Sequence, residues 1–198
     1  AKGGFPEPLQ STAWSITTLE TKAVKGNARS LPEALSGIPS IMVQKTALGQ
    51  SSPYIRGLTG YHNVLLVDGI RLNHSAMRSG PNQYWSTVEL FGSDRIEALR
   101  GTHGVLFGAD AVGGIVNSLS SKPYYSNQKN NRSFELLGRT SSAEHSISAG
   151  FSAEVSSPKW FAEISHIERS FGDLDGGRKI GRQKNTGYDV KGSQARLS

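Results

Sequence analysis

The titratable residues of this chain do not form a recognisable catalytic or metal-binding pattern. Asp94, Glu97 and Asp110 are spaced too irregularly to propose a general acid and base pair. The histidines also lack the spacing of metal ligands; they are His62, His74, His103, His145 and His166. Because the chain has no cysteine, disulfides and thiolate metal sites are excluded. We therefore expect no catalytic residue, no metal and no cofactor, and we expect that the protein is not an enzyme.

Two segments have a superficial likeness to ligand-binding loops. Gly101, Gly104 and Gly108 suggest a phosphate cradle, but their spacing matches neither the dinucleotide fingerprint nor the P-loop. The segment Asp173-Leu-Asp175-Gly-Gly177 is similar to part of a calcium loop, yet it lacks the remaining ligands and the closing glutamate. A soluble α/β protein that binds phosphate or a nucleotide through residues 101–114 stays open as an alternative function.

Arg56 and Arg100 each precede a glycine at the end of an apolar run. The plainest interpretation of each is an exposed cation beside a turn. Arginine also carries a rigid fork that binds a carboxylate through two hydrogen bonds, and it stays charged when partly buried.

The composition favours short strands, turns and loops over the core of a compact enzyme. Hydrophobic residues make up 36% of the chain, and 23 of its 198 residues are glycine. The formal charge is +6, but the basic residues are scattered, which argues against a nucleic-acid-binding module. No apolar run has the length of a membrane helix, and residues 1–8 lack the apolar core of a signal peptide. We expect no nucleic-acid partner.

The elements that must position these residues begin with short strands and one capped helix. Residues 12–19 and 41–43 predict strands, because they are rich in β-branched and aromatic or apolar side chains. The capping-box pattern of residues 30–33 predicts a helix over residues 31–36. Asp68-Gly69 predicts a two-residue hairpin turn, preceded by a strand that is buried on both faces.

Residues 73–85 are polar and aperiodic, and we expect a long loop there. After this loop the pattern predicts a helical turn at residues 87–91 and strands at residues 95–99 and 115–119. Residues 105–108 add a further turn between these strands. Five glycines between residues 101 and 114 indicate backbone that turns tightly or approaches other backbone closely.

After residue 132 a two-residue period dominates. From His145 to Val155 apolar side chains alternate with small or polar ones, as in a barrel wall between lipid and a polar lumen. Further strands are expected at residues 134–139, 160–171 and 188–197, which makes four strands in all. The alternation of residues 160–171 slips in phase near His166. Residues 172–185 are expected to form a long polar loop. Four strands cannot close a barrel, so we expect an amino-terminal fragment of a longer protein.

Four pieces of the chain, in this order and spacing, resemble the plug domain of TonB-dependent outer-membrane receptors. They are residues 30–39, Ile55-Arg56-Gly57, Val67-Asp68-Gly69, and the segment from Leu99-Arg100-Gly101 to Gly113-Gly114. The departures are modest. Thr102 stands where the family usually has proline, Phe107 where it usually has tyrosine, and residues 118–120 replace its usual isoleucine-x-threonine ending.

The resemblance implies an α+β plug domain with a small mixed sheet and short helices, followed by antiparallel strands of an incomplete transmembrane β-barrel. The plug would span residues 1–120, a linker residues 121–132, and the first barrel strands residues 133–198. It also implies a ligand-gated importer in the outer membrane of a Gram-negative bacterium. The solute would be a ferric siderophore, cobalamin or another metal chelate, and the residues do not separate these.

The partners implied by the resemblance are TonB with its inner-membrane energising complex, the solute, and outer-membrane lipid. The TonB box is expected upstream, because no copy of it precedes Thr12. Outward-facing plug loops at residues 48–52, 59–62 and 75–85 would bind the solute, and Arg56 and Arg100 would pair with barrel carboxylates. The candidate substrate-binding residues are Tyr61, His62, Met77, Arg78, Asn82, Gln83, Tyr84 and Trp85. Alternatively, Tyr84 and Trp85 anchor the loop to the plug core.

Overall fold

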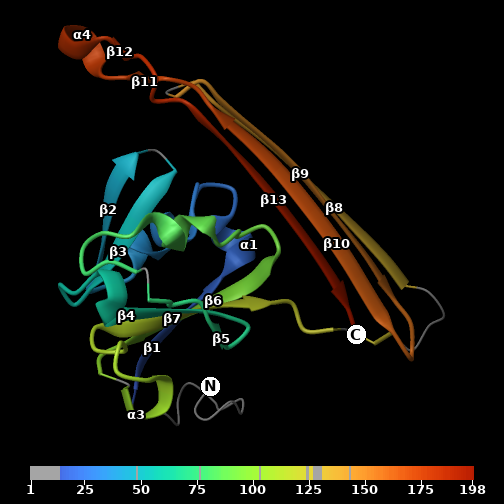
Figure 1. Cartoon of the computed structure of the whole chain (residues 1–198). Helices are drawn as coiled ribbons and strands as arrows, with labels where there is room; N and C mark the ends of the chain where they lie inside the picture. The colour runs from blue at the N-terminus through green and yellow to red at the C-terminus, as the bar shows by residue number, and fades with distance from the viewer. Residues whose placement is uncertain are drawn as a thin grey trace. The chain divides into compact units, whose positions relative to one another are not determined.

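The structure is a computed structural model that describes residues 14–198 except residues 48, 76, 103, 124, 127–130 and 143. It divides after Ser121 into two compact units (Figure 1). The first unit combines a mixed sheet with short helices, and the second is built from long antiparallel strands. This architecture confirms the predicted fold class.

The first unit is organised around a five-stranded sheet in the order β1-β6-β7-β4-β5. The strands β4 and β7 are parallel, and every other neighbouring pair in this sheet is antiparallel. The bounds are β1 (Ser15–Glu20), β4 (Asn63–Val67), β5 (Ile70–Arg71), β6 (Ser93–Arg100) and β7 (Gly114–Ser120). The start of the predicted first strand, at residues 12 and 13, lies outside the described residues.

The predicted turn at Asp68-Gly69 is confirmed. It joins β4 to β5, and its two residues have φ values of 50° and 81°, which a primed hairpin turn requires. The preceding strand is buried on both faces, as expected, since Leu65 packs in one apolar cluster while Val64 and Leu66 pack in another.

Short helices and a separate hairpin cover the Leu65 face of the sheet. Leu31, Ile55, Trp85, Ile96 and Val116 are completely buried there. The covering elements are α1 (Thr21–Val24), α2 (Leu31–Ala34), η3 (Leu35–Gly37), β2 (Ile41–Ala47), β3 (Gln50–Ile55) and η5 (Gln83–Thr87). A further 3-10 helix, η4 (Gly60–His62), directly precedes β4. On the opposite face, Val64, Leu66, Leu99 and Ile115 pack with Trp14, Ile16, Ala111 and Phe107. Phe107 is the last residue of α3 (Gly104–Phe107).

Two local predictions in this unit were wrong. The helical turn expected at residues 87–91 lies earlier, at η5, because the Asn82 side chain accepts a hydrogen bond from the Tyr84 amide and starts the turn there. The loop expected at residues 48–52 is mostly strand, because β3 begins at Gln50 and pairs with β2 as a hairpin.

The predicted capping box is confirmed, except that one of its two hydrogen bonds comes from the residue before the expected donor. Ser30 Oγ accepts a hydrogen bond from the Glu33 amide at 3.4 Å. The Glu33 carboxylate accepts one from the amide of Arg29 rather than of Ser30, at 2.6 Å. Glu33 also binds the Arg29 guanidinium at 2.8 Å and Lys45 Nζ at 2.6 Å, so this carboxylate ties α2 to β2.

The second unit is a four-stranded antiparallel sheet in the order β13-β10-β9-β8 with an unbroken register. Its strands are β8 (Asn131–Ser141), β9 (Ser146–Ser156), β10 (Phe161–Phe171) and β13 (Tyr188–Leu197). The predicted long loop after β10 contains a small hairpin made of β11 (Leu174–Asp175), α4 (Gly177–Ile180) and β12 (Arg182–Gln183). This hairpin extends past the strand ends of the same sheet in Figure 1.

The two faces of this sheet differ in polarity. Ile147, Ala149 and Phe151 of β9 lie on one face and are exposed, whereas Ser146 and Ser148 lie on the other and are buried. On β10 the first face becomes polar from His166 onward, which is the position of the phase slip in the sequence. No helix among the described residues has the length and apolarity needed to cross a membrane.

We predict that Glu33→Gln destabilises the first unit at neutral pH. Burial of the Glu33 carboxyl opposes its charged form, but the Lys45 and Arg29 hydrogen bonds and charges outweigh burial and lower its pKa. The stabilisation is therefore present above about pH 4.3, the usual value for an unfolded glutamate, and is lost as the pH falls through the lower folded pKa. The loss at pH 7 should be about 1–2 kcal/mol in denaturant unfolding.

Glu20→Gln is the matched control, because Glu20 is an exposed carboxylate at the end of β1. It should leave the free energy of unfolding nearly unchanged. A Glu33→Gln deficit of equal size at pH 7 and pH 3 would contradict the assignment.

Candidate functional site

The three predicted loop segments lie together in the structure. Ser51 in β3 donates its amide to Ser86 Oγ at 3.0 Å, and Ser86 Oγ donates back to the Ser51 carbonyl at 3.1 Å. The Asn82 amide donates to Ser52 Oγ at 3.0 Å. Thr59, which precedes η4, contacts Ser52 through hydroxyls 3.2 Å apart. Segments separated by up to 35 residues are thus held by one set of short polar side chains.

We call this set the hydroxyl network; its members are Ser30, Ser51, Ser52, Thr59, Asn82 and Ser86. Ser30 joins it through Ser51, with 2.8 Å between the two hydroxyl oxygens, so the N-cap of α2 belongs to the same network. All members except the partly exposed Ser86 are buried. Because buried polar groups are costly when unpaired, these bonds strongly constrain the geometry of the loops above them.

A second contact joins η4 to the loop after β5. The Tyr61 amide donates to the Arg78 carbonyl at 3.0 Å. Gly60 has a φ of 66°, and a Cβ at this position would collide with the carbonyl oxygens of Arg78 and Ser79. Glycine is therefore required where the two segments cross.

The candidate substrate-binding residues separate into a buried and an accessible group. Trp85 is fully buried, and Met77 and Asn82 are 7% and 2% exposed, so these three support the loops from below. Tyr61 and Tyr84 are about 40% exposed, Arg78 and Gln83 are exposed, and His62 is half-buried. We call the accessible group, together with His74, the loop surface: Tyr61, His62, His74, Arg78, Gln83 and Tyr84.

His74 belongs to this surface although the sequence did not single it out as a binding residue. Its ring lies edge-on to the ring of Tyr84, with centroids 5.3 Å apart. The rings of Tyr61 and His62 form a second pair, with centroids 4.4 Å apart. Each tyrosine is thus accompanied by an imidazole, and the surface offers flat rings and hydrogen-bonding groups side by side.

Arg56 and Arg100 both lie beside the turn at Pro39 and Ser40. Arg100 donates to the Pro39 carbonyl and to Thr17 Oγ1, both at 3.0 Å, so it joins β6 to β1 and to this turn. Arg56 has a φ of 52° and donates its amide to the Ser40 carbonyl. Its guanidinium is exposed beside Gly101 and makes no ion pair with any residue that the structure describes.

The glycine-rich segment serves close packing in this structure. A Cβ at Gly113 would collide with the side chains of Asn63 and Leu58, and one at Gly114 with the Leu99 carbonyl and Ile55. Gly108 lies against the guanidinium of Arg71. These glycines face protein atoms rather than an open cradle, so the alternative of phosphate or nucleotide binding is not supported.

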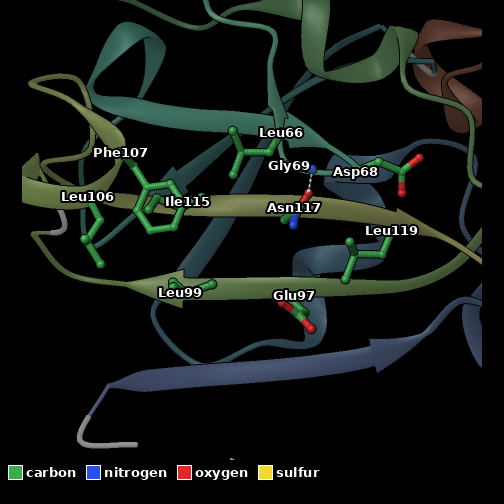
Figure 2. Close-up of a pocket in the computed structure, with 10 residues that line it drawn as sticks. All are labelled: Leu66, Asp68, Gly69, Glu97, Leu99, Leu106, Phe107, Ile115, Asn117 and Leu119. Atoms are coloured by element: carbon green, nitrogen blue, oxygen red, sulfur yellow. Dashed lines mark hydrogen bonds between the residues drawn. The ribbon is translucent and has the colours of Figure 1, made fainter. Parts of the chain in front are cut away.

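A cavity of about 390 Å³ opens on the face of the sheet that carries Leu66 (Figure 2). Its walls are mostly apolar and come from Leu66, Leu99, Leu106, Phe107, Ile115 and Leu119. Its two carboxylates already have partners: Glu97 pairs with Arg95 at 3.2 Å, and Asp68 accepts hydrogen bonds from the amide and hydroxyl of Ser120. The cavity suits an apolar group better than a charged solute.

Arg71 contacts Phe107, one of the residues that line this cavity. Its guanidinium forms an ion pair with Asp110 and donates to the Phe107 carbonyl. Because Phe107 lines the cavity, these two interactions of Arg71 connect β5 to the wall that α3 forms.

The described residues contain no group of three histidine or acidic side chains that could hold a metal ion. Of the five histidines in the sequence, His103 lies outside the described residues. In the segment that resembles a calcium loop, Asp173 accepts hydrogen bonds from the amides of Thr186 and Gly187. These two bonds lower the pKa of Asp173 and use its carboxylate to close the base of the β11–β12 hairpin.

Comparison with known proteins identifies relatives of the chain. The model of the TonB-dependent receptor plug domain matches residues 8–115. The vitamin B12 transporter BtuB of Vibrio vulnificus is 27% identical over 98% of the chain and 29% of its own length. The corresponding transporter of Photobacterium profundum is 29% identical over 59% of the chain and 19% of its own length.

Among solved structures, the open form of the ferric-catecholate import receptor Fiu from E. coli K12 has a TM-score of 0.65 at 19% identity. It matches 96% of the chain and 25% of its own length. The likeness to Fiu concerns the fold alone. These matching proteins are transporters and receptors rather than enzymes, which agrees with the prediction from sequence.

We predict that Gly60→Ala separates the η4 turn from the Arg78 loop. The added Cβ would collide with two carbonyl oxygens, and alanine is strained at this φ. Hydrogen exchange should become faster at the Tyr61 amide, and the free energy of unfolding should fall by about 1–3 kcal/mol. Gly80→Ala is the control in the same loop, because a Cβ there meets no atom within 4 Å. Equal exchange rates in the two variants would refute the role of Gly60.

Proposed function

The chain belongs to the TonB-dependent receptor plug domain family, and on this premise we propose that it gates a ligand-operated importer. The chain spans 19% and 29% of the length of the two curated relatives, so activity, solute and partners of the whole receptor are proposed here. The solute is a scarce metal chelate such as a ferric siderophore or cobalamin.

The observation that carries this proposal is the convergence of three separate segments into one exposed surface. Tyr61, Arg78 and Tyr84 come from different turns, and the hydroxyl network positions their backbone. A surface of rings and donors on a rigid base is what binding of a bulky solute requires. We propose that the loop surface, supported by Met77, Asn82 and Trp85, contacts the solute.

The second unit supports a location in the outer membrane of a Gram-negative bacterium. Its exposed apolar face suits lipid, and its opposite face carries polar and charged side chains such as Ser148, Ser165 and Arg169, which suit a polar lumen. We propose that residues 1–120 form the plug, that residues 121–132 link it to the barrel, and that residues 133–198 provide the first barrel strands.

TonB and its inner-membrane energising complex are the proposed source of energy. Solute bound at the loop surface would bias the plug toward the form that TonB recognises, and TonB would then rearrange the plug to open a path. β1 is an edge strand that pairs with β6 alone among the described strands, and this suits such a rearrangement because few hydrogen bonds must break.

We further propose that Arg56 and Arg100 pair with carboxylates of the barrel. Arg56 supports this most directly, because its exposed guanidinium has no ion pair among the described residues. Arg100 has bonds within the plug, so its role there is in part structural.

Uptake of labelled chelates by cells that carry the receptor tests the function. Uptake of at least one chelate should depend both on the receptor gene and on TonB, and alanine replacement of Tyr61 and Tyr84 together should reduce it at least about tenfold. The proposal fails if uptake is unchanged in cells without TonB, or if no metal chelate is taken up.

Replacement of Arg56 tests the plug–barrel pairing. Arg56→Gln should leave the unfolding midpoint of the plug unchanged but should make cells more sensitive to large antibiotics, since a loosened plug leaks. Arg100→Gln should lower stability by about 1–2 kcal/mol, because the Pro39 carbonyl loses its charged donor. Unchanged antibiotic sensitivity in Arg56→Gln cells would count against the pairing.

A further inference from the structure

Acidic residues are nearly absent from the segment that builds the loop surface. Between Glu33 and Glu89 the only acidic residue is Asp68, whereas the same stretch holds Lys45, Arg56, Arg71 and Arg78. Asp68 lies at the far end of β4 from η4 and is bonded to Ser120. No carboxylate of this segment is therefore placed to neutralise a cation at the loop surface.

The cations of the segment differ in whether they are already paired. Lys45 binds Glu33, and Arg71 binds Asp110. Arg78 is exposed and makes no ion pair with any residue in the described part of the chain. Its backbone is held next to Tyr61 by the hydrogen bond from the Tyr61 amide, so this charge stays within the loop surface.

The other groups of this surface can also donate hydrogen bonds to a ligand, although phenol and neutral imidazole groups accept them as well. The phenol and imidazole groups of Tyr61, Tyr84, His62 and His74 can each donate a hydrogen bond. Beneath them, Asn82 Nδ2 and Trp85 Nε1 are buried donors without an acceptor in the described structure. Such a surface is complementary to a ligand that is rich in negatively charged oxygen atoms.

We infer that the loop surface selects a polyanionic metal chelate built from aromatic rings, over neutral macrocyclic chelates. Arg78 supplies the charge complement, and the rings of Tyr61 and Tyr84 stack on flat ligand rings. A neutral macrocycle would gain the stacking but would leave Arg78 desolvated and unpaired, which costs affinity. This inference rests on the proposed function as a chelate receptor.

Equilibrium binding to the purified receptor in detergent tests the inference with two probes. One is the ferric complex of a tris-catecholate, which is strongly anionic, and the other is cyanocobalamin, which is neutral overall. The receptor should bind the anionic probe at least about tenfold more tightly, and this preference should weaken as salt screens the charge.

Variants of Arg78 then test whether this residue causes the preference for the anionic probe. Arg78→Gln should weaken binding of the anionic probe about tenfold and leave any binding of the neutral probe unchanged. Arg78→Lys should recover part of the loss. Lys22→Gln removes one exposed charge from α1, which contributes no residue to the loop surface, and should have no effect on either probe.

The outcomes separate this inference from the proposed function. Tighter binding of the neutral probe, or equal binding of the anionic probe by wild type and Arg78→Gln, overturns the inference while the receptor function stands. If neither these probes nor other metal chelates bind, the proposed function itself fails. Unfolding midpoints of all variants should match that of the wild type, because Arg78 has no side-chain partner to lose among the described residues.

Discussion

The arrangement of the candidate site depends on the hydroxyl network beneath it. Short side chains such as Ser51, Ser52 and Thr59 have few rotamers, so their hydrogen bonds fix both distance and direction. Loss of one member would leave a buried partner without a hydrogen bond, so any other arrangement of the network would have a higher free energy. This explains how two short 3-10 helices and the loop between β5 and η5 can present Tyr61, Tyr84 and Arg78 in a fixed relation.

Close backbone packing gives the network its foundation. Gly113 and Gly114 let β7 begin directly against Asn63, Leu58 and Ile55, the last of which ends β3. The Asn63 amide group in turn donates to the Leu58 carbonyl, at 2.6 Å. The sheet and the β2–β3 hairpin are thereby held at a distance that side chains larger than hydrogen would not allow. Gly113 and Gly114, which end the glycine-rich segment 101–114, are therefore needed for close packing beneath the network.

Sequence reasoning succeeded where a feature is encoded locally. The Asp68-Gly69 turn, the Ser30–Glu33 cap and the alternation in β9 each depend on neighbouring residues, and each was predicted. It could not separate Tyr84 from Trp85, because one is exposed and the other buried through long-range contacts of an aperiodic loop. His74 was missed for the same reason: only the folded chain brings its ring against Tyr84. The bonds of Ser51 to Ser86 likewise span 35 residues.

The second unit exposes a continuous row of apolar side chains on one face of its sheet. Phe134, Leu136, Ile147 and Ile164 are between 52% and 72% exposed on one face, while Ser148 and Ser165 on the other face are only 4% exposed. In water this distribution would be unfavourable, because a continuous apolar face promotes association. In lipid the same face is solvated.

The change of polarity along β10 fits the same explanation. Glu168 pairs with Lys191 across β10 and β13, on the apolar face but nearer to the β11–β12 hairpin than Ile164 is. A charged pair is tolerated where hydrocarbon gives way to headgroups, whereas it would be costly at mid-membrane depth. In the proposed barrel, the phase slip at His166 would mark where the strand leaves the hydrocarbon layer, and the register of β10 with its neighbours is unbroken there.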